Sequence, residues 1–263
     1  MQISGSTVLL TGATGGIGHA IAKAVVDRGG RLIVSGRRGD ALEDLAAQFG
    51  ARTVTVDLAV PDEVERLAKE AGEVDILIAN AALPASGTLD SFTVNEIDRA
   101  LDVNLRAPMV LAHELAPAMT AKGRGHLLFM SSILGKAAMS GTSVYSATKY
   151  GLRGFASSLR ADLRDTGVGV SVVFPGVVRE AGMFADAKVD VPRGTGTSSP
   201  EEVAGAVVSA IEKNRGEVDV APLPVRAVSM IAGIAPEFAA GFTRRIGADK
   251  VTAKVAEGQR DKR

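Results

Sequence analysis

Cysteine is absent from the 263 residues of this sequence, and histidine occurs only three times. The lack of cysteine excludes disulfide bonds, thiolate catalysis and thiolate metal ligands, and it is typical of a reducing compartment, so we expect a cytoplasmic protein. The histidines, His19, His113 and His126, stand singly without the spacing of metal ligands. We therefore expect them in surface or packing roles, and we expect no metal site.

An excess of charge of either sign is also missing, because 30 basic residues balance 30 acidic residues. This balance disfavours a partner such as nucleic acid or an anionic membrane, which a basic surface would attract. No apolar run reaches the roughly 18 residues that a membrane span requires. We expect no secretory signal either, because residues 1–6 lead directly into an apolar run. With 46% apolar residues the chain can bury a large core, so we expect a compact protein with a small-molecule partner.

Short apolar runs rich in β-branched residues alternate with segments of helical spacing along the chain. Runs without polar alternation indicate strands that are buried on both faces, and the alternation of strand and helix indicates parallel crossovers. The sequence therefore predicts an α/β fold with a doubly wound parallel β-sheet and helices on both faces, Rossmann-like, in a single domain. We expect strands at residues 7–10, 31–34, 53–56, 74–78, 126–130 and 170–174.

The first predicted strand ends in the glycine-rich stretch TGATGGIG, residues 11–18, after which the pattern becomes helical. Glycines at such a turn let the backbone approach a pyrophosphate, whose charge the amide groups and the helix dipole neutralise. A tight turn without a ligand is the alternative interpretation. We interpret the stretch as a dinucleotide site, with cofactor contacts from Gly12, Thr14, Gly15, Gly16, Ile17 and Gly18.

The ends of the next strands carry residues suited to the adenosine half of a dinucleotide. After the second strand, Gly36 and Arg37 offer room and positive charge for a 2′-phosphate, so we expect NADP as cofactor, with NAD as the alternative. Asp57, followed by Leu58, suits the adenine amino group, and Asn80 suits a tie between two strand ends. Solvated surface charge and ordinary turn residues remain the alternatives.

Tyr145 and Lys149 lie four residues apart in the stretch SVYSATKYG, so on a helix they share one face. Alone, this pair is a weak signal. A tyrosine hydroxyl has an ordinary pKa of about 10, and a neighbouring ammonium favours the phenolate. We therefore expect Lys149 to lower the pKa of Tyr145, and to hold the ribose of a nicotinamide nucleotide.

Two further polar features accompany this pair. Ser131 and Ser132 follow the fifth strand, where a hydroxyl can donate a hydrogen bond to a carbonyl oxygen that gains negative charge, and we select Ser132 for this role. Asn104 precedes Pro108 by four residues in a helix that we expect from 94 to 119. Because proline lacks an N–H group, we expect a bend and a free carbonyl at Asn104, with a simple packing kink as the alternative.

This set of motifs resembles the short-chain dehydrogenase/reductase family over about residues 7–220. The resemblance rests on TGATGGIG, Asp57, NAA at 80–82, Asn104, the two serines, YSATK, and Pro175 with Gly176. It implies a catalytic tetrad of Asn104, Ser132, Tyr145 and Lys149, and it implies contacts of Gly12, Gly16 and Gly18 to the phosphates, of Asp57 to the adenine, and of Pro175, Gly176 and Val178 to the nicotinamide side. Two positions depart from the family pattern, Ala82 from a frequent glycine and Glu180 from a frequent threonine.

The resemblance also implies an activity, hydride transfer between NADP(H) and a carbonyl or secondary alcohol, with Tyr145 as general acid/base. A non-catalytic NADP-binding redox sensor and a nucleotide-sugar epimerase or dehydratase are the alternatives. Analogy further implies a homodimer or homotetramer that pairs through the helices expected at 94–119 and 143–165. An apolar substrate pocket is expected from Leu134, Met139, Val177, Met183 and Phe184.

No linker or internal repeat divides the chain. We assign residues 1–222 to the dinucleotide-binding and catalytic domain, in which the Gly-, Pro- and Thr-rich segment 177–199 is expected to form a substrate lid. Residues 223–263 are expected to extend the same domain with a helix at 225–245 and a disordered tail at 256–263.

Overall fold

The fold is known from a computed structural model that describes residues 1–182, 196–235, 237, 241 and 248–259. Its centre is one parallel sheet of seven strands in the order β3-β2-β1-β4-β5-β6-β7. The strands are β1 (Thr7–Thr11), β2 (Arg31–Gly36), β3 (Arg52–Thr55), β4 (Ile76–Ala79), β5 (Gly125–Met130), β6 (Val168–Pro175) and β7 (Glu217–Val220). The doubly wound fold and the strands at all six predicted runs are therefore confirmed, and β7 is an additional strand at one edge.

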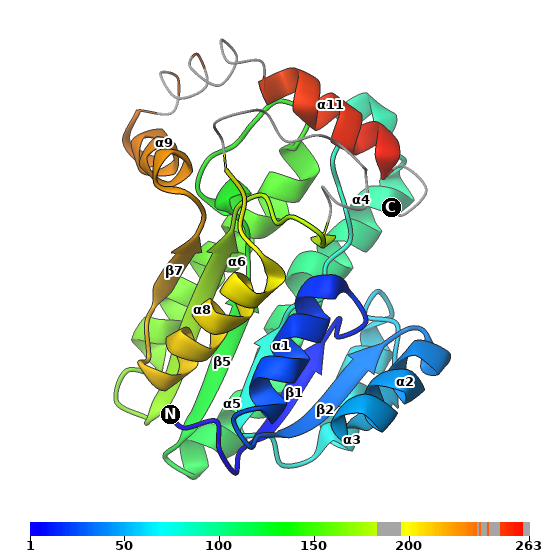
Figure 1. Ribbon diagram of the computed structural model, residues 1–263, viewed down its shortest axis with the longest axis vertical. Helices are drawn as coiled ribbons and strands as arrows, with labels where there is room; N and C mark the ends of the chain where they lie inside the picture. The colour runs from blue at the N-terminus through cyan, green and yellow to red at the C-terminus, as the bar shows by residue number, and fades with distance from the viewer. Residues whose placement is uncertain (183–195, 236, 238–240, 242–247, 260–263) are drawn as a thin grey trace.

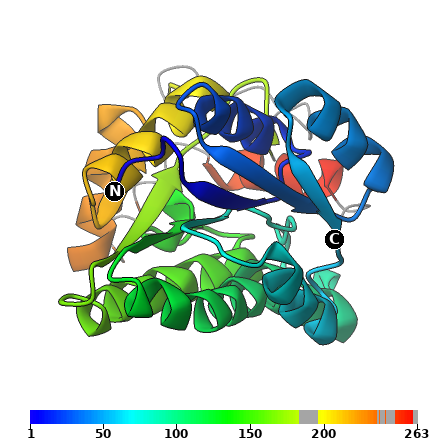
Figure 2. The same ribbon diagram turned by 90° about the horizontal axis from the view of Figure 1, so that it is seen from below.

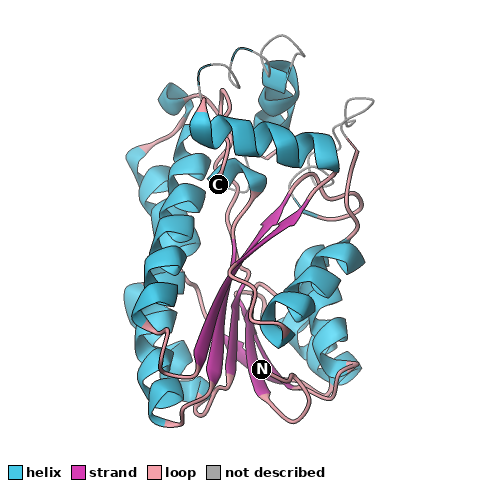
Figure 3. Cartoon of the chain, turned by 90° about the vertical axis from the view of Figure 1, so that its left-hand side faces the viewer, coloured by secondary structure: helices cyan, strands magenta, loops and turns pink. Residues whose placement is uncertain are grey.

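Helices cover both faces of the sheet, as Figures 2 and 3 show. One layer contains α1 (Gly16–Val26), α2 (Gly39–Phe49) and α8 (Pro200–Glu212), and the other contains α3 (Pro61–Ala71), α5 (Ala107–Ala121) and α6 (Ser143–Asp162). Strand β1 explains the uninterrupted apolar runs, because Leu9 packs in the core beneath α3, α5 and α6, whereas Val8 and Leu10 pack in the core beneath α1, α2 and α8. Both faces of a central strand therefore require apolar side chains.

The helix expected at 94–119 is divided into three parts. Helix α4 (Val94–Leu101) begins with a capping box between Thr93 and Glu96, a π-helical turn η2 follows at Asp102–Arg106, and α5 begins at Ala107. At this junction the amide of Ala107 donates to the carbonyl of Asp102, five residues earlier. The interruption that Pro108 predicts is therefore present, and it takes the form of a π turn.

Two C-terminal helices lie beyond the carboxyl edge of the sheet (Figure 1). Helix α9 (Leu223–Ile234) starts two residues before the predicted 225–245 helix, and several residues of that helix's second half lie outside the described part of the chain. The predicted disordered tail is wrong for its first residues, because α11 (Ala248–Gly258) includes Ala256 and Val255 beside it is only 3% exposed. Apolar burial holds this helix, whose Thr252 lies close to the loop at Gly141.

Candidate active site

The predicted site residues gather at the carboxyl edge of the sheet. Strand β1 has β2 on one side and β4 on the other, which is the point where the strand order reverses. Ligands of doubly wound sheets bind in the crevice at this point. The glycine-rich turn follows β1, Asn80 follows β4, the two serines follow β5, and Gly176 follows β6.

The glycine-rich turn has no space for side chains at three positions. Gly12 has a φ of 68°, and a Cβ there would lie 2.7 Å from the Cα of Ala81. A Cβ on Gly18 would overlap the carbonyl oxygen of Gly12, and a Cβ on Gly16 would lie 2.6 Å from the Cβ of Ala181. Helix α1 begins at Gly16 after a glycine N-cap that forms no side-chain capping bond. Its first amide groups therefore remain suited to a bound anion.

Asn80 ties two strand ends together, as the sequence predicts. Its amide nitrogen Nδ2 donates to the carbonyls of Thr11 and Gly12, each at 3.1 Å. In the reverse direction, the Oγ1 of Thr11 accepts hydrogen bonds from the backbone amides of Asn80 and Ala81, each also at 3.1 Å. Thr11 is the first residue of the glycine-rich motif, and its position in the sequence alone did not indicate this role. These bonds fix the glycine-rich turn against the end of β4.

The residues predicted for the adenosine half lie at the ends of β2 and β3. Arg37 is exposed directly after β2, and it makes no hydrogen bond or ion pair with any residue that the structure describes. The carboxylate of Asp57 accepts from the amide of Ala59 at 3.0 Å and lies 3.4 Å from Nη2 of Arg99. Leu58 beside it is buried. The Arg99 contact comes from α4, which the sequence could not place next to β3.

The two adjacent serines have different partners. The hydroxyl of Ser131 donates to the carbonyl of Lys149 at 3.0 Å, so it fastens the end of β5 to α6. The Oγ of Ser132 accepts from the amide of Leu134 at 3.2 Å and lies 3.5 Å from the carbonyl oxygen of Pro175. Its interaction with the side chain of Tyr145 lowers the pKa of that phenol. The structure thus brings Ser132, and not Ser131, to the tyrosine.

Tyr145 and Lys149 lie on one face of α6, and both are buried. The ammonium Nζ of Lys149 lies 5.5 Å from the centroid of the Tyr145 ring and donates to the carbonyl of Met130 at 2.9 Å. Burial raises the pKa of Tyr145 to about 12, against a weaker lowering by the Ser132 hydrogen bond. The prediction that Lys149 lowers the pKa of Tyr145 is therefore wrong for the protein without a bound nucleotide. Burial penalises the phenolate more than the ammonium, 5.5 Å from the ring centroid, stabilises it. Burial lowers the pKa of Lys149 to about 8.

Asn104 lies in the π turn, fully buried. Its side-chain oxygen accepts from the amide of Leu83 at 2.6 Å, and its side-chain nitrogen donates to the carbonyl of Leu83 at 3.0 Å. The side chain therefore forms both backbone hydrogen bonds of Leu83, as the backbone of a neighbouring strand would, and it holds the loop that follows β4 in place. This contact gives Asn104 a structural role that the sequence analysis did not predict.

The chain that follows β6 returns toward the glycine-rich turn. Val178 is buried and pairs with Ser198 in an isolated parallel bridge. Glu180, at the position where the sequence departs from the family, has a φ of 65° and a side chain that is 77% exposed. The next residue, Ala181, packs against Gly16. Most of the predicted lid, residues 183–195, lies outside the described part of the chain.

An apolar cluster surrounds Tyr145. Ala85, Ala100 and Val144 are buried with it, and Leu134, one of the predicted pocket residues, packs against them. Met139 and Val177 are half-buried, whereas Met183 and Phe184 lie outside the described residues. Phe92 and Ile97 also join the cluster, and the sequence analysis missed both for this site. Phe92 follows the short helix η1 (Leu89–Ser91) and Ile97 lies in α4, and only the tertiary fold brings those segments to α6.

This fold and site are those of a dinucleotide-dependent oxidoreductase, and comparisons with known proteins agree. The family model "short chain dehydrogenase" matches residues 6–191. The ketoacyl reductase HetN of Nostoc is 35% identical over 232 residues, which cover 85% of this chain and 81% of HetN. The SDR family member 7B dehydrogenase/reductase of Bos taurus is 31% identical, covering 86% of this chain and 77% of the relative.

A solved structure gives the same answer. The short-chain dehydrogenase from Sphingobium yanoikuyae, determined in complex with NADPH, superposes with a TM-score of 0.77 at 28% identity, covering 89% of this chain and 94% of that one. The chain belongs to the short-chain dehydrogenase/reductase family and is an NAD(P)-dependent dehydrogenase or reductase. Within the described residues, no helix has the length and apolar character needed to cross a membrane.

Proposed function

We propose that the protein is an NADP(H)-dependent carbonyl reductase or alcohol dehydrogenase whose general acid/base is Tyr145. The observation that carries this proposal is the buried trio of Ser132, Tyr145 and Lys149 at the carboxyl edge of the sheet. Lys149 donates to the end of β5 with its ammonium 5.5 Å from the centroid of the Tyr145 ring, and Ser132 interacts with the phenol and lowers its pKa.

The residues present fit a bound NADP. Gly12, Gly16 and Gly18 have no room for a side chain, so they allow the tight turn before α1, and the uncapped first turn of α1 suits the two phosphates. Arg37, exposed and without a described partner, suits a 2′-phosphate, and Asp57 suits the adenine amino group. Contacts from Thr14, Gly15, Ile17, Leu58, Asn80, Pro175, Gly176 and Val178 belong to the same proposal. A reduced nicotinamide, when bound, supplies the hydride for the carbonyl carbon.

The side chains of this protein supply the proton and the charge stabilisation. With a pKa of about 12, Tyr145 is protonated at neutral pH and can donate its proton to a carbonyl oxygen. Ser132 donates a hydrogen bond to that oxygen as negative charge develops on it. With a pKa of about 8, Lys149 is a cation at neutral pH, and its charge favours the phenolate that remains after proton donation. The apolar cluster around Tyr145 excludes water and suits an apolar substituent of the substrate.

The test is an assay of carbonyl reduction in which the absorbance of NADPH is recorded. The initial slope gives the rate, and the final absorbance gives the net consumption of NADPH. Ethyl acetoacetate, 4-nitrobenzaldehyde and 9,10-phenanthrenequinone sample ketoester, aldehyde and quinone chemistry. Replacement Tyr145→Phe should remove nearly all turnover and leave NADPH binding intact, because only the transferable proton is lost. The matched control is Tyr150→Phe, five residues along the same helix and 40% exposed. A Tyr145→Phe enzyme with normal rates would refute the proposal, and product formation without net NADPH loss would favour the epimerase alternative.

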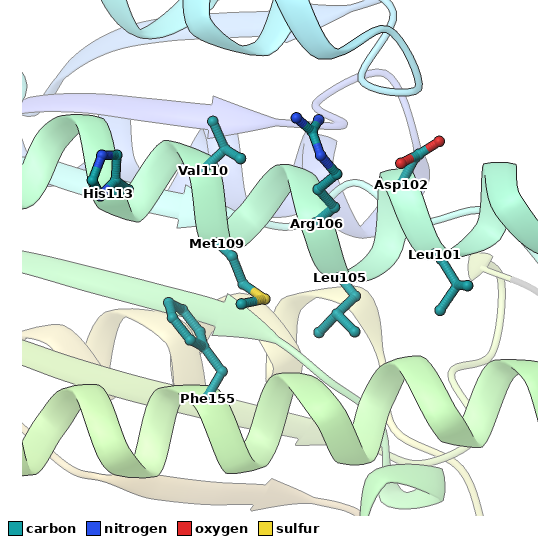
Figure 4. Close-up of a pocket in the computed structure, with 8 residues that line it drawn as sticks. All are labelled: Leu101, Asp102, Leu105, Arg106, Met109, Val110, His113 and Phe155. Atoms are coloured by element: carbon teal, nitrogen blue, oxygen red, sulfur yellow. The ribbon is translucent and has the colours of Figure 1, made fainter.

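We further propose a homodimer, the basic unit of either predicted oligomer. An apolar groove of about 510 Å³ runs between η2 with the start of α5 and helix α6 (Figure 4). Met109 is 38% exposed there, and Asp102 and Arg106 lie at the rim. A two-fold axis would place the acid of one copy near the base of the other, which makes the face self-complementary. Light scattering of Met109→Glu should show monomers where the wild type is dimeric, and an unchanged mass would contradict this face. The other lining residues are Leu101, Leu105, Val110, His113 and Phe155.

A further inference from the structure

The turn that carries Ser132 is fastened to its surroundings at several points, and two of them follow Ser132 directly in the sequence. Directly after Ser132 comes the short helix η3 (Ile133–Gly135), whose last residue packs on the backbone of α6. A Cβ on Gly135 would lie 2.8 Å from the carbonyl oxygen of Lys149, so no side chain fits there. The second point is the next residue, Lys136, whose side chain is only 11% exposed.

Lys136 reaches across to the edge strand β7. Its ammonium lies 2.6 Å from Oδ1 of Asp219 and 2.9 Å from Oε2 of Glu217. It also lies 4.0 Å from the centroid of the Phe174 ring, in cation–π geometry. Phe174 immediately precedes Pro175, whose carbonyl oxygen is a contact of the Ser132 hydroxyl. The lysine and the serine therefore meet neighbouring residues of β6.

The two carboxylates have other cationic partners as well. Arg153 of α6 binds Glu217 through two nitrogens, at 2.7 and 3.2 Å, and Arg226 of α9 lies 4.0 Å from Asp219. Strand β7 therefore keeps attachments to α6 and α9 without Lys136. Among the described residues, only Lys136 connects these acids to the serine turn, whereas Arg153 and Arg226 share the role of holding β7.

We infer that Lys136 is a positioning residue, which anchors the Ser132 turn to β7 and thereby keeps the Ser132 hydroxyl beside Tyr145. The inference rests on the proposed role of Ser132 in reduction. Because the turn is held on α6 and also on β7, it cannot rotate about its contact with α6 while the contact with β7 is intact. Loss of the β7 anchor leaves the turn attached on the α6 side alone and lets the hydroxyl move relative to the phenol.

The direct test reads the environment of the phenol. The chain has only two tyrosines, so replacement of both by 3-fluorotyrosine gives two ¹⁹F resonances, which Tyr150→Phe assigns. Ser132→Ala should shift the Tyr145 resonance because the hydroxyl that interacts with the phenol is lost. Lys136→Met should shift it in the same direction, Lys136→Arg should restore it, and the matched control Arg153→Met, in the same ion cluster, should leave it unchanged.

An unshifted resonance in folded Lys136→Met would overturn the inference. If circular dichroism shows that this variant is unfolded, Asp219→Ala replaces it, since it removes the closer of the two acids and leaves Glu217. An unshifted resonance in Asp219→Ala would then overturn the inference equally.

Kinetics separate this inference from the proposed function. With the fastest of the three carbonyl probes, Lys136→Met should lower kcat about tenfold or more, with little change in the KM for NADPH, since small misplacements of a catalytic group cost factors of this size. The double variant with Ser132→Ala should be no slower than Ser132→Ala alone, because the lysine acts through the serine. Additive losses would refute the positioning role only. Normal rates in Ser132→Ala would refute the proposed function of the serine itself.

Discussion

Acid should destabilise this protein through a single histidine, His126. The side chain is fully buried on β5, and its Nε2 lies 2.8 Å from Oγ of Ser171. That hydroxyl donates to the carbonyl of Arg215 at 2.6 Å, so it accepts a hydrogen bond from the N–H group of Nε2. Nδ1 is buried with no partner in the described structure, and Gly169 packs against it. A second proton on the ring would therefore have no acceptor.

The size of the effect follows from the pKa of this ring. Burial, aided by the charges of the N-terminal ammonium and Arg160, lowers the pKa of His126 from 6.5 to about 3. The folded pKa is the lower one, so the unfolded chain binds the extra proton, and stability that is complete above pH 6.5 is lost as the pH falls toward 3. At pH 5 the loss is about 2 kcal/mol, from 1.36 kcal/mol for each unit below 6.5. This is a large share of a typical unfolding free energy of about 5–15 kcal/mol.

The assay is urea unfolding at several pH values between 8 and 5. In this range His126 should dominate, because acids such as Glu217 act lower. Burial alone would raise the pKa of Glu217, but hydrogen bonds from Arg153 and Lys136 leave it below its ordinary value of 4.5. His126→Gln retains a donor for Ser171 and cannot be protonated, so its unfolding free energy should vary less with pH by about 2 kcal/mol. His19→Gln, at the surface beside Gln48, is the control. Equal pH slopes for wild type and His126→Gln would refute the argument.

Three other predictions concern the site. Arg37→Asp should shift the ratio of the dissociation constants toward NAD, as measured by nucleotide fluorescence titration, and an unchanged ratio would show that Arg37 does not bind the 2′-phosphate. The reduction rate should fall above pH 8 as Lys149 loses its charge. The Lys149→Arg variant should not show this decline, because its guanidinium stays protonated. Parallel pH–rate profiles for the wild type and the variant would contradict this role of Lys149. Gly18→Ala should lower both the melting temperature and nucleotide affinity, because its Cβ overlaps the carbonyl of Gly12, whereas Gly205→Ala in α8, where nothing lies within 4 Å, should leave the affinity unchanged and should not lower the melting temperature.

The sequence predicted those parts of the fold whose signal is local. The first six strands could be predicted because their apolar runs are continuous. Strand β7 alternates acidic and apolar residues, Glu217, Val218, Asp219 and Val220, and the two acids interrupt the apolar run by which the other strands were predicted. Those acids are inside the ion cluster with Lys136, which no local pattern reveals. The end of α11 is likewise stabilised by burial of Val255, although its neighbouring sequence is polar enough to resemble a tail.

The site shows the same division between local and tertiary information. The spacing of Tyr145 and Lys149 placed both on one helical face, and the position of Ser132 after a strand placed it at the carboxyl edge. The direction of the pKa shift of Tyr145 was not accessible, because it depends on how completely other segments bury the ring. The hydrogen bonds of Asn104 to Leu83 similarly join segments that only the folded chain brings together.

Because of the π turn between α4 and α5, apolar residues that follow one helical period in the sequence pack in two different clusters. Along the sequence, Ile97, Ala100, Leu111 and Leu115 follow a single helical period. One additional residue in a helix rotates everything after it by about 100°. Ile97 and Ala100 consequently face Tyr145, while Leu111 and Leu115 face the sheet. Removing one residue from this turn would rotate the two halves relative to each other, so that the protein could keep either its core packing or the apolar cluster around Tyr145, but not both.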